Sequence, residues 1–171
     1  MRNLLIPTKR LLWGAFALLV LAIAAAIWPA LALPWALLAG AFALLAAVDG
    51  LAALAIAAPA AKRLVPGSLA LGVRHEVVLR FVNPVSAPLL VEAHDHAPAH
   101  SETEGLPQRV TIPAQGWAEM RYAMKPVARG DLAFGRVELR LGSRAGLWQV
   151  KRFAGEEGTV RVYPNFAALT G

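Results

Sequence analysis

Three histidines near the middle of the chain are the side chains best suited to bind a metal ion. His94 and His96 flank Asp95, and His100 follows shortly after. On a strand, alternate residues point to the same face, so His94 and His96 would lie side by side, with His100 reaching them from the next turn. Three imidazoles can bind Zn²⁺ or Cu²⁺. The intervening Ala-Pro-Ala at 97–99 disfavours this geometry, so a polar loop is the main interpretation and a metal-binding or metal-sensing protein is the alternative.

Asp49 is the other candidate for chemistry, because it interrupts a long apolar stretch. From Leu11 to Ala61 it is the only residue with a charged side chain. A carboxylate inside a bilayer is costly and is a functional hypothesis by default. We expect a structural role, in which Asp49 accepts a hydrogen bond from the first helix, lies near the inner headgroups or contacts a partner helix. An accessory subunit of a transporter is an alternative, although a proton or ion pathway would need further polar groups.

The motifs that carry known enzymatic chemistry are missing from the sequence. There is no phosphate-binding loop, no dinucleotide fingerprint and no H-E-x-x-H pair. The segment GSRAG at 142–146 places its serine one position too early for a nucleophile elbow. The chain also has no cysteine, which excludes disulfides and thiolate metal sites. We therefore predict a protein that is not an enzyme and has no cofactor.

The uncharged region at 11–61 divides into two apolar runs, at about 11–30 and 35–58. As helices they would measure roughly 30 Å and 36 Å, enough to cross a hydrocarbon core of about 30 Å. Pro29 and Pro34 lie between them and interrupt helical hydrogen bonding. A connection this short predicts two antiparallel transmembrane helices, with Trp28 and Trp35 at the membrane interface.

Basic residues lie at both outer ends of this hairpin, and none lies at its bend. They are Arg2, Lys9, Arg10, Lys62 and Arg63. The positive-inside rule then places the N-terminus, residues 1–10, and everything after the hairpin in the cytoplasm. A signal peptide cleaved after the Ala-Leu-Ala at 30–32 is the alternative. In that case the second run would stop transfer, and the remainder of the chain would still be cytoplasmic.

Small residues recur along one face of the second run. They are Ala36, Gly40, Ala43, Ala47 and Gly50. Small residues at steps of three and four let helix backbones approach closely. We expect this face to pack against the first helix, at Ala15, Ala22 and Ala26. Another membrane protein or a second copy of the chain, which would make a homo-oligomer, is the alternative partner.

After a linker at 62–66, the pattern of residues 67–171 is typical of short strands. Apolar residues alternate with polar ones at 75–82, 88–95, 108–112, 117–124, 131–141, 147–153 and 159–163, and Gly, Pro and Asn lie between these runs. A slip near Gly135 suggests a bulge within 131–141. The spacing predicts an all-β antiparallel sandwich of the immunoglobulin-like kind. We expect Phe81, Trp117, Phe134 and Trp148 to supply its large core side chains.

The net charge of +6 does not indicate nucleic-acid binding, because of where the charges lie. Much of the excess flanks the hairpin, and acidic and basic residues nearly balance in the β region. A nucleic-acid protein usually carries a basic stripe with interleaved aromatic residues. The predicted partners are therefore the lipid bilayer and another protein.

The order of elements and three late motifs resemble the bacterial "domain of unknown function 58" family. PVARGDLAFG at 126–135 is similar to the family's R-G-x-y-x-x-G strand, and TVRVYP at 159–164 to its v-x-V-Y-P strand. LRLGSRAGLW at 139–148 is similar to l-x-S-x-D-P-F-G-L-f, with Ala145 where Pro-Phe would stand. Each motif is weak alone, but the family also has a membrane hairpin with an Asp in its second helix.

The resemblance implies a multi-pass protein of the bacterial inner membrane that works with a MoxR-type AAA+ ATPase. Members of the family continue beyond V-Y-P into a von Willebrand factor A-like domain, whereas this sequence ends at Gly171. We therefore expect a fragment, a truncated product or a member without that second half, and no catalytic residue of the family can be assigned. The resulting hypothesis is a non-enzymatic membrane-anchored scaffold in protein-complex maturation or envelope function.

Overall fold

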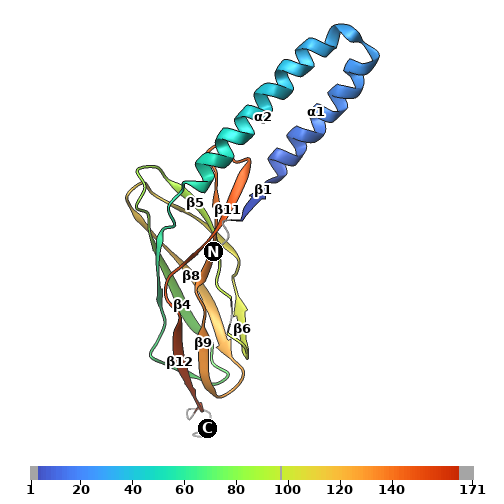
Figure 1. The fold of residues 1–171 in the computed structure, drawn as a ribbon. Helices are drawn as coiled ribbons and strands as arrows, with labels where there is room; N and C mark the ends of the chain where they lie inside the picture. Colours follow the sequence, from blue (N-terminus) through green and yellow to red (C-terminus); the bar gives the residue numbers. More distant parts are fainter. Residues whose placement is uncertain (1–3, 97, 166–171) are drawn as a thin grey trace. The chain divides into compact units, whose positions relative to one another are not determined.

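The computed structural model describes residues 4–96 and 98–165, so Arg2 lies outside the described part. The chain forms two compact units: Met1–Ile56 with Leu141–Lys151, and Ala57–Arg140 with Arg152–Gly171. The first contains a helical hairpin and the second a β-sandwich (Figure 1). The chain therefore combines two long apolar helices with an immunoglobulin-like β-sandwich, as the sequence predicts.

The hairpin consists of β1 (Leu5–Pro7), α1 (Lys9–Ile27), η1 (Pro29–Leu31) and α2 (Ala32–Leu54). Thr8 caps α1, so this helix begins before the residue 11 expected from hydropathy. Pro34 lies inside the first turn of α2 rather than before the helix. A first-turn residue needs no backbone N–H for helical hydrogen bonding, so proline is tolerated there. α2 ends at Leu54, short of the expected residue 58.

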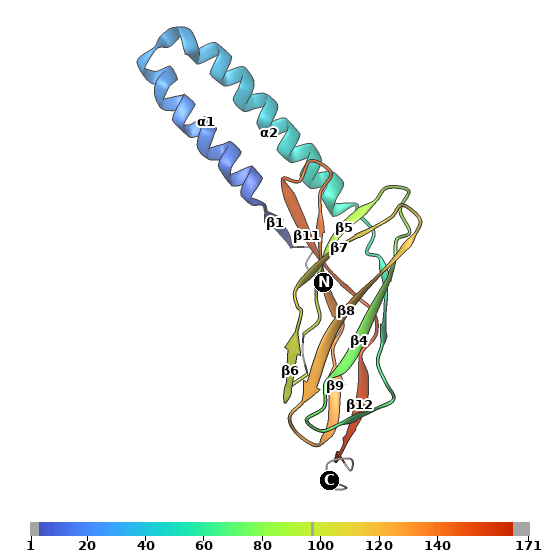
Figure 2. The same ribbon diagram turned by 180° about the vertical axis from the view of Figure 1, so that it is seen from behind.

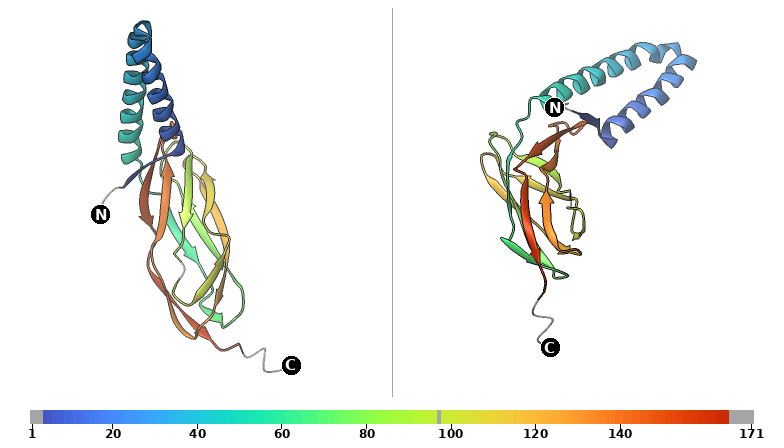
Figure 3. Two further views of the ribbon diagram at one scale, coloured as in Figure 1. Left: turned by 90° about the vertical axis from the view of Figure 1, so that its right-hand side faces the viewer. Right: turned by 60° about the horizontal axis from the view of Figure 1, so that its bottom comes forward.

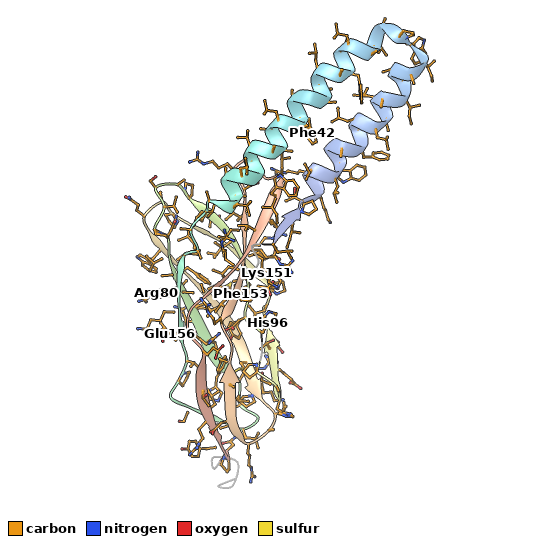
Figure 4. The ribbon with its side chains drawn as sticks, viewed as in Figure 1. Phe42, Arg80, His96, Lys151, Phe153 and Glu156 are labelled. Carbon is orange, nitrogen blue, oxygen red and sulfur yellow. The ribbon has the colours of Figure 1, made fainter. Side chains whose placement is uncertain are left out.

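The helices pack through a stripe that differs from the predicted one. The α2 residues turned inward recur at steps of four and three and are at least partly buried: Trp35, Ala39, Phe42, Ala46, Asp49 and Ala53. Phe42 lies between the two helices (Figure 4), where a Cβ added to Gly14 would be only 2.5 Å from the Phe42 Cζ. The Trp35 indole donates a hydrogen bond to the Leu18 carbonyl at 2.9 Å.

The predicted packing face is therefore wrong in phase by one residue over most of its length. Ala36, Gly40, Ala43 and Ala47 are exposed, and nothing lies within 4 Å of a Cβ added to Gly40. Only Gly50 is buried, against Trp148 and Leu5. The physical reason is that large side chains, Trp35 and Phe42, make the interhelical contacts, so close backbone approach is needed only at Gly14.

The strands form three groups joined by hydrogen bonds, and most of these strands belong to the second unit (Figures 1, 2 and 3). One sheet has the order β2-β4-β8-β6, with β2 at Ala60–Leu64, β4 at His75–Val82, β8 at Trp117–Pro126 and β6 at Ser101–Glu104. Another has the order β1-β11-β10-β5-β7, with β11 at Trp148–Ala154, β10 at Val137–Gly142, β5 at Leu89–His94 and β7 at Gln108–Ile112. In this sheet, β1 and the first residues of β11 belong to the first unit. The third is β3-β12-β9, with β3 at Ser68–Ala70, β12 at Gly158–Tyr163 and β9 at Gly130–Phe134.

Antiparallel pairing joins β2 to β4, β4 to β8, β6 to β8, β5 to β7 and β9 to β12, whereas an edge strand, β3, pairs in the parallel sense. β3 pairs with β12 in the parallel sense, with Leu69 opposite Val162. The segment predicted as one strand at 131–141 is two strands, β9 and β10, in different sheets. Gly135 and Arg136 separate them, so the phase slip in the pattern marks a crossing between sheets rather than a bulge.

Alternation along the strands produces the core of the sandwich. On β4, Val77, Leu79 and Phe81 are fully buried while the residues between them are less so. Phe134 is also buried, which confirms two of the four expected large core residues. Trp117 is 62% exposed, so that prediction is wrong: its pairing with Val82 at a strand end places it on the outer face.

The residues expected to form a linker are part of the sheet. Lys62 and Arg63 belong to β2, whose five residues pair with β4 from Ala60 opposite Val82 to Leu64 opposite Val78. The hydrogen bonds of this ladder satisfy backbone groups that a linker would leave to water. The stretch between α2 and β2 is therefore short, Ala55 to Pro59.

Candidate functional site

Asp49, near the end of α2, is buried and accepts three hydrogen bonds from a single turn of the chain. The Ser143 hydroxyl donates to its Oδ2 at 2.5 Å, and the Leu147 N–H donates to the same oxygen at 3.2 Å. The Ala145 N–H donates to its Oδ1 at 2.9 Å. Both carboxylate oxygens are thus matched by donors, as buried polar groups usually are. We call Asp49, Ser143, Ala145 and Leu147 the Asp49 clasp.

The turn is also bound to α2 through Trp148. Its indole N–H donates to the Ala46 carbonyl at 2.8 Å, and its backbone N–H donates to the Ser143 hydroxyl at 3.0 Å. Gly50 allows this approach, because a Cβ there would lie 3.1 Å from the Trp148 Nε1. Ser143 therefore acts in both directions, donating to Asp49 and accepting from Trp148.

The same turn is held from the start of α1. The Thr8 hydroxyl donates to the Gly146 carbonyl at 2.7 Å, and the Thr8 N–H donates to the Leu147 carbonyl at 2.9 Å. Gly146 has a φ of +72°, and a Cβ there would be 2.9 Å from the Arg10 Nη1. The neighbouring strand β1 pairs antiparallel with the beginning of β11, with Leu5 opposite Val150.

These contacts show what the buried carboxylate does in the first unit. In the described part of the chain, the hydrogen bonds to Asp49 do not come from the first helix, where one was expected. Its donors come from residues 143–147, almost a hundred positions further along the chain. The clasp joins the last part of α2 to this turn, and the separate Thr8 contacts join the start of α1 to it.

The three histidines do not converge. The His94 Nε2 is 2.8 Å from Glu92 Oε1, and the His96 Nε2 is 2.9 Å from Glu138 Oε2. His100 lies in a turn with a φ of +66°. Within residues 4–96 and 98–165, no three His, Cys, Asp or Glu side chains form a group that could hold a metal ion. Each of the first two imidazoles has its own carboxylate partner instead.

A buried charged cluster that the sequence pattern did not reveal lies inside the sandwich. The Arg63 guanidinium binds Asp95 through two contacts of 2.9 and 2.6 Å, and their side chains are 8% and 1% exposed. The Tyr122 hydroxyl donates to Asp95 at 2.6 Å. Burial, together with the hydrogen bond to the Asp95 carboxylate, raises the pKa of Tyr122 well above its usual range. The Arg63 guanidinium also lies 4.7 Å from the Phe134 ring centre.

This cluster connects residues from two different sheets. Arg63 is on β2 and Tyr122 on β8, whereas Asp95 follows β5. The central residue of the His-Asp-His motif is thus the buried one, and its partner Arg63 was taken from the sequence as a membrane-flanking charge. The Arg63 Nη2 also donates to the Gly135 carbonyl at 2.8 Å, so one side chain bonds to Asp95 and to the segment between β9 and β10.

A shallow groove of about 490 Å³ lies on the sheet formed by β4, β6 and β8. Its charged side chains pair with one another: Arg74 contacts Glu104 at 2.7 Å and Arg121 contacts Glu76 at 3.1 Å. These pairs place charges of both signs on the exposed face of the groove. The groove suits recognition of a charged surface better than catalysis.

No protein-family model and no curated protein matches the chain. Among solved structures, the FixG-related protein from Vibrio parahaemolyticus is similar at 7% identity, over 63% of this chain and 98% of that one, with a TM-score of 0.41. The cupredoxin domain of amoB from Nitrosocaldus yellowstonii is similar at 16% identity, over 52% and 55%, with a TM-score of 0.33. A PapD-like domain of human CEP192 is similar at 12% identity, over 61% and 83%, with a TM-score of 0.36.

Proposed function

We propose that the protein is a non-enzymatic scaffold, anchored in a membrane by its helical hairpin, whose sandwich binds a protein partner. The observation that carries this proposal is the apolar, uncovered surface of both helices. Lys9–Ile27 and Pro29–Leu54 each have a mean hydropathy of 2.2, with 6% and 0% of their most apolar windows buried. Leaving so much apolar surface in water is unfavourable, and a bilayer removes that cost.

The distribution of charge supports an orientation with the start of α1 and the end of α2 on the cytoplasmic side. Lys9 and Arg10 lie at the start of α1 and Lys62 follows α2, whereas the bend at 28–35 has no charge. Arg63 is neutralised by Asp95, yet four basic residues, Arg2, Lys9, Arg10 and Lys62, still flank the hairpin in the sequence. The protein would then be a multi-pass protein of a bacterial inner membrane, with its sandwich in the cytoplasm.

The Asp49 clasp supports the family resemblance in one respect. The clasp uses Ser143 and Leu147, and Gly146 turns between them; all three match the family's S-x-D-P-F-G-L segment. In this chain, residues of that segment bind the Asp in the second helix. We therefore propose a MoxR-type AAA+ ATPase as the partner.

Neither alternative function gains support from the geometry. The first two histidines are bonded to separate carboxylates, so they are not available together for a metal. The oxygens of Asp49 are bonded to the chain's own donors, which is unfavourable for a carboxylate that carries protons or ions in a transporter subunit.

Co-purification from native membranes tests the scaffold. The full chain, tagged at its C-terminus, is solubilised in mild detergent after cross-linking, with ATP or a slowly hydrolysed analogue present. We expect an AAA+ ATPase of the MoxR type to be enriched over untagged membranes. A variant with Arg121→Glu in the groove serves as a second bait: reduced capture places the partner on the groove. Recovery of no AAA+ ATPase with either bait contradicts the proposal.

A further inference from the structure

One end of the sandwich has an apolar surface without charge. Residues 81–91 and 110–118 contain no Asp, Glu, Lys, Arg or His. Three large apolar side chains there are exposed to solvent: Val82 by 47%, Leu90 by 53% and Trp117 by 62%. We call residues 60, 82–90 and 111–117 the uncharged end. In Figures 1 and 2, the loops after β4 and after β7 lie side by side at this end, and the last strand, β12, runs to the opposite end.

Asn83 holds these loops in a fixed arrangement. It is 1% exposed, and its amide donates to the Ala87 carbonyl at 2.8 Å and to the Pro113 carbonyl at 2.9 Å. The two loops are also joined by backbone hydrogen bonds, from Asn83 to Gly116 and from Gln115 to Val85, each of 2.9 Å. The exposed apolar side chains therefore sit on an ordered platform, where presenting them to a partner costs little conformational entropy.

The first charged residues next to the uncharged end lie two positions further along the strands, on the outer face of the sheet. Ala60, Val82 and Trp117 are directly paired on β2, β4 and β8, and the next row of that face is Lys62, Arg80 and Glu119. The Arg80 guanidinium lies 5.5 Å from the Trp117 ring centre and binds Glu119. Figure 4 shows Arg80 on the outer side of β4. Behind Trp117 the row thus carries Lys62 and an Arg80–Glu119 ion pair. An exposed tryptophan among uncharged residues, with a basic residue behind it, is the composition found where proteins meet the headgroup region of a bilayer.

The chain itself keeps this end close to the bilayer if α2 spans it. α2 ends at Leu54 and β2 begins at Ala60, the first residue of the uncharged end. A connection of this length reaches at most about 20 Å even when fully extended. At the opposite end, the exposed Val127 and Tyr163 lie among charged residues such as Arg129 and Arg161.

We infer that the uncharged end docks on the lipid headgroup region of the membrane that holds the hairpin. This inference rests on the proposed membrane anchor and extends it: the sandwich would have a second, peripheral contact with lipid. The Trp117 indole and the side chains of Val82 and Leu90 enter the interface, and Lys62 and Arg80 face the phosphates behind them. Docking would leave the opposite end, with its charged residues, free for a protein partner.

Site-specific fluorescence on the full chain tests this contact, since the protein has no native cysteine. A single cysteine replaces Ala114 at the uncharged end, and in a matched variant it replaces Ser68 in β3, near the opposite end; both positions are exposed. Each variant carries an environment-sensitive fluorophore and is reconstituted into vesicles of phosphatidylcholine with a quarter phosphatidylglycerol. Some vesicles include a lipid with a nitroxide near its headgroup. Flotation of the vesicles reports anchoring separately.

We expect the probe at position 114 to emit at shorter wavelength and to be quenched by the nitroxide lipid, and the probe at position 68 to do neither. Trp117→Glu in the Ala114→Cys background should abolish the quenching, whereas Val127→Glu, an equally exposed apolar position at the opposite end, should leave it unchanged. Floating protein with no quenching at 114 overturns the docking and spares the anchor. A blue shift without quenching means that protein, not lipid, covers the end. Protein that does not float overturns both.

Discussion

Replacing Asp49 should loosen the turn at 142–148 while leaving the hairpin in the membrane. In Asp49→Leu, the Ser143 hydroxyl and the Ala145 and Leu147 amides lose their acceptor. A buried donor left without a partner costs about 1–3 kcal/mol, and bonds to a charged acceptor are at the upper end of this range. Because the turn can open partly to water, we expect a total cost of about 3–5 kcal/mol rather than the full sum. Leucine also favours insertion of the helix, so the effect on the turn is separable from anchoring.

Asp49→Asn should give an intermediate result. The remaining amide oxygen can keep the two bonds made by Oδ2, from Ser143 and Leu147, but the amide NH₂ then faces the Ala145 N–H, a second donor. We expect about 1–2 kcal/mol from the lost bond and the lost charge. The order of turn stability is therefore Asp49, then Asn, then Leu.

Hydrogen exchange measured by mass spectrometry on the full chain in nanodiscs reads this out directly. A loss of about 3 kcal/mol in the opening free energy speeds exchange of the peptide covering 141–151 by about two orders of magnitude. Asp131→Asn is the matched control, because Asp131 is an exposed carboxylate paired with Arg161 in the other unit. If the peptide exchanges in Asp49→Leu as slowly as in the control, the clasp does not stabilise the turn and the reasoning is refuted.

Three further outcomes follow from contacts within each unit. Gly14→Ala should destabilise the hairpin by about 1–3 kcal/mol, because the added methyl group clashes with Phe42. Gly40→Ala is the control: its methyl group meets open space, so the variant should be as stable as the parent or slightly more stable. The melting temperatures of the two variants in detergent test this difference. Asp95→Asn should cost about 3–5 kcal/mol in urea unfolding, because it leaves a buried guanidinium without its counter-charge, and a cost below 1 kcal/mol would mean that the pair is not buried in solution. The hydrogen bond from Arg109 lowers the pKa of Glu92 from 4.5, so the ionised Glu92 contributes to stability above pH 4.5, and this contribution is lost as the pH falls through the lower folded pKa. In a pH series of melting temperatures, Arg109→Gln should reduce this loss of stability on the acid side. An unchanged pH profile in the variant would contradict the role of Arg109.

The sequence predicted the elements whose period is strong and local. The apolar runs become α1 and α2, and the alternating segments at 75–82 and 108–112 become β4 and β7 with the same bounds. The strands it missed, β1, β2, β3 and β6, are short or lie in segments read as linker and turn. β2 reads as a basic linker because Lys62 and Arg63 follow an apolar run, and only pairing with β4 reveals it as a strand.

The sequence predicts that Asp49 is important, but not which residues donate hydrogen bonds to it. Asp49 stands out because a charged side chain in an apolar helix needs a reason. Its donors lie far away in the sequence, in a turn whose backbone amides have no side-chain signature. The small-residue stripe failed for a related reason: helical period defines several possible faces, and only the contacts of Trp35 and Phe42 select one.

The central claim, that two helices cross a membrane and leave the sandwich in the cytoplasm, is tested most directly by labelling single cysteines in spheroplasts. One cysteine replaces Ala30 in the exposed bend, and the other replaces Ser68 in the sandwich. With a maleimide that cannot cross membranes, we predict that position 30 reacts in intact spheroplasts and that position 68 reacts only after lysis. Labelling of position 68 in intact spheroplasts, with position 30 protected, would contradict the orientation and the proposed cytoplasmic partner together.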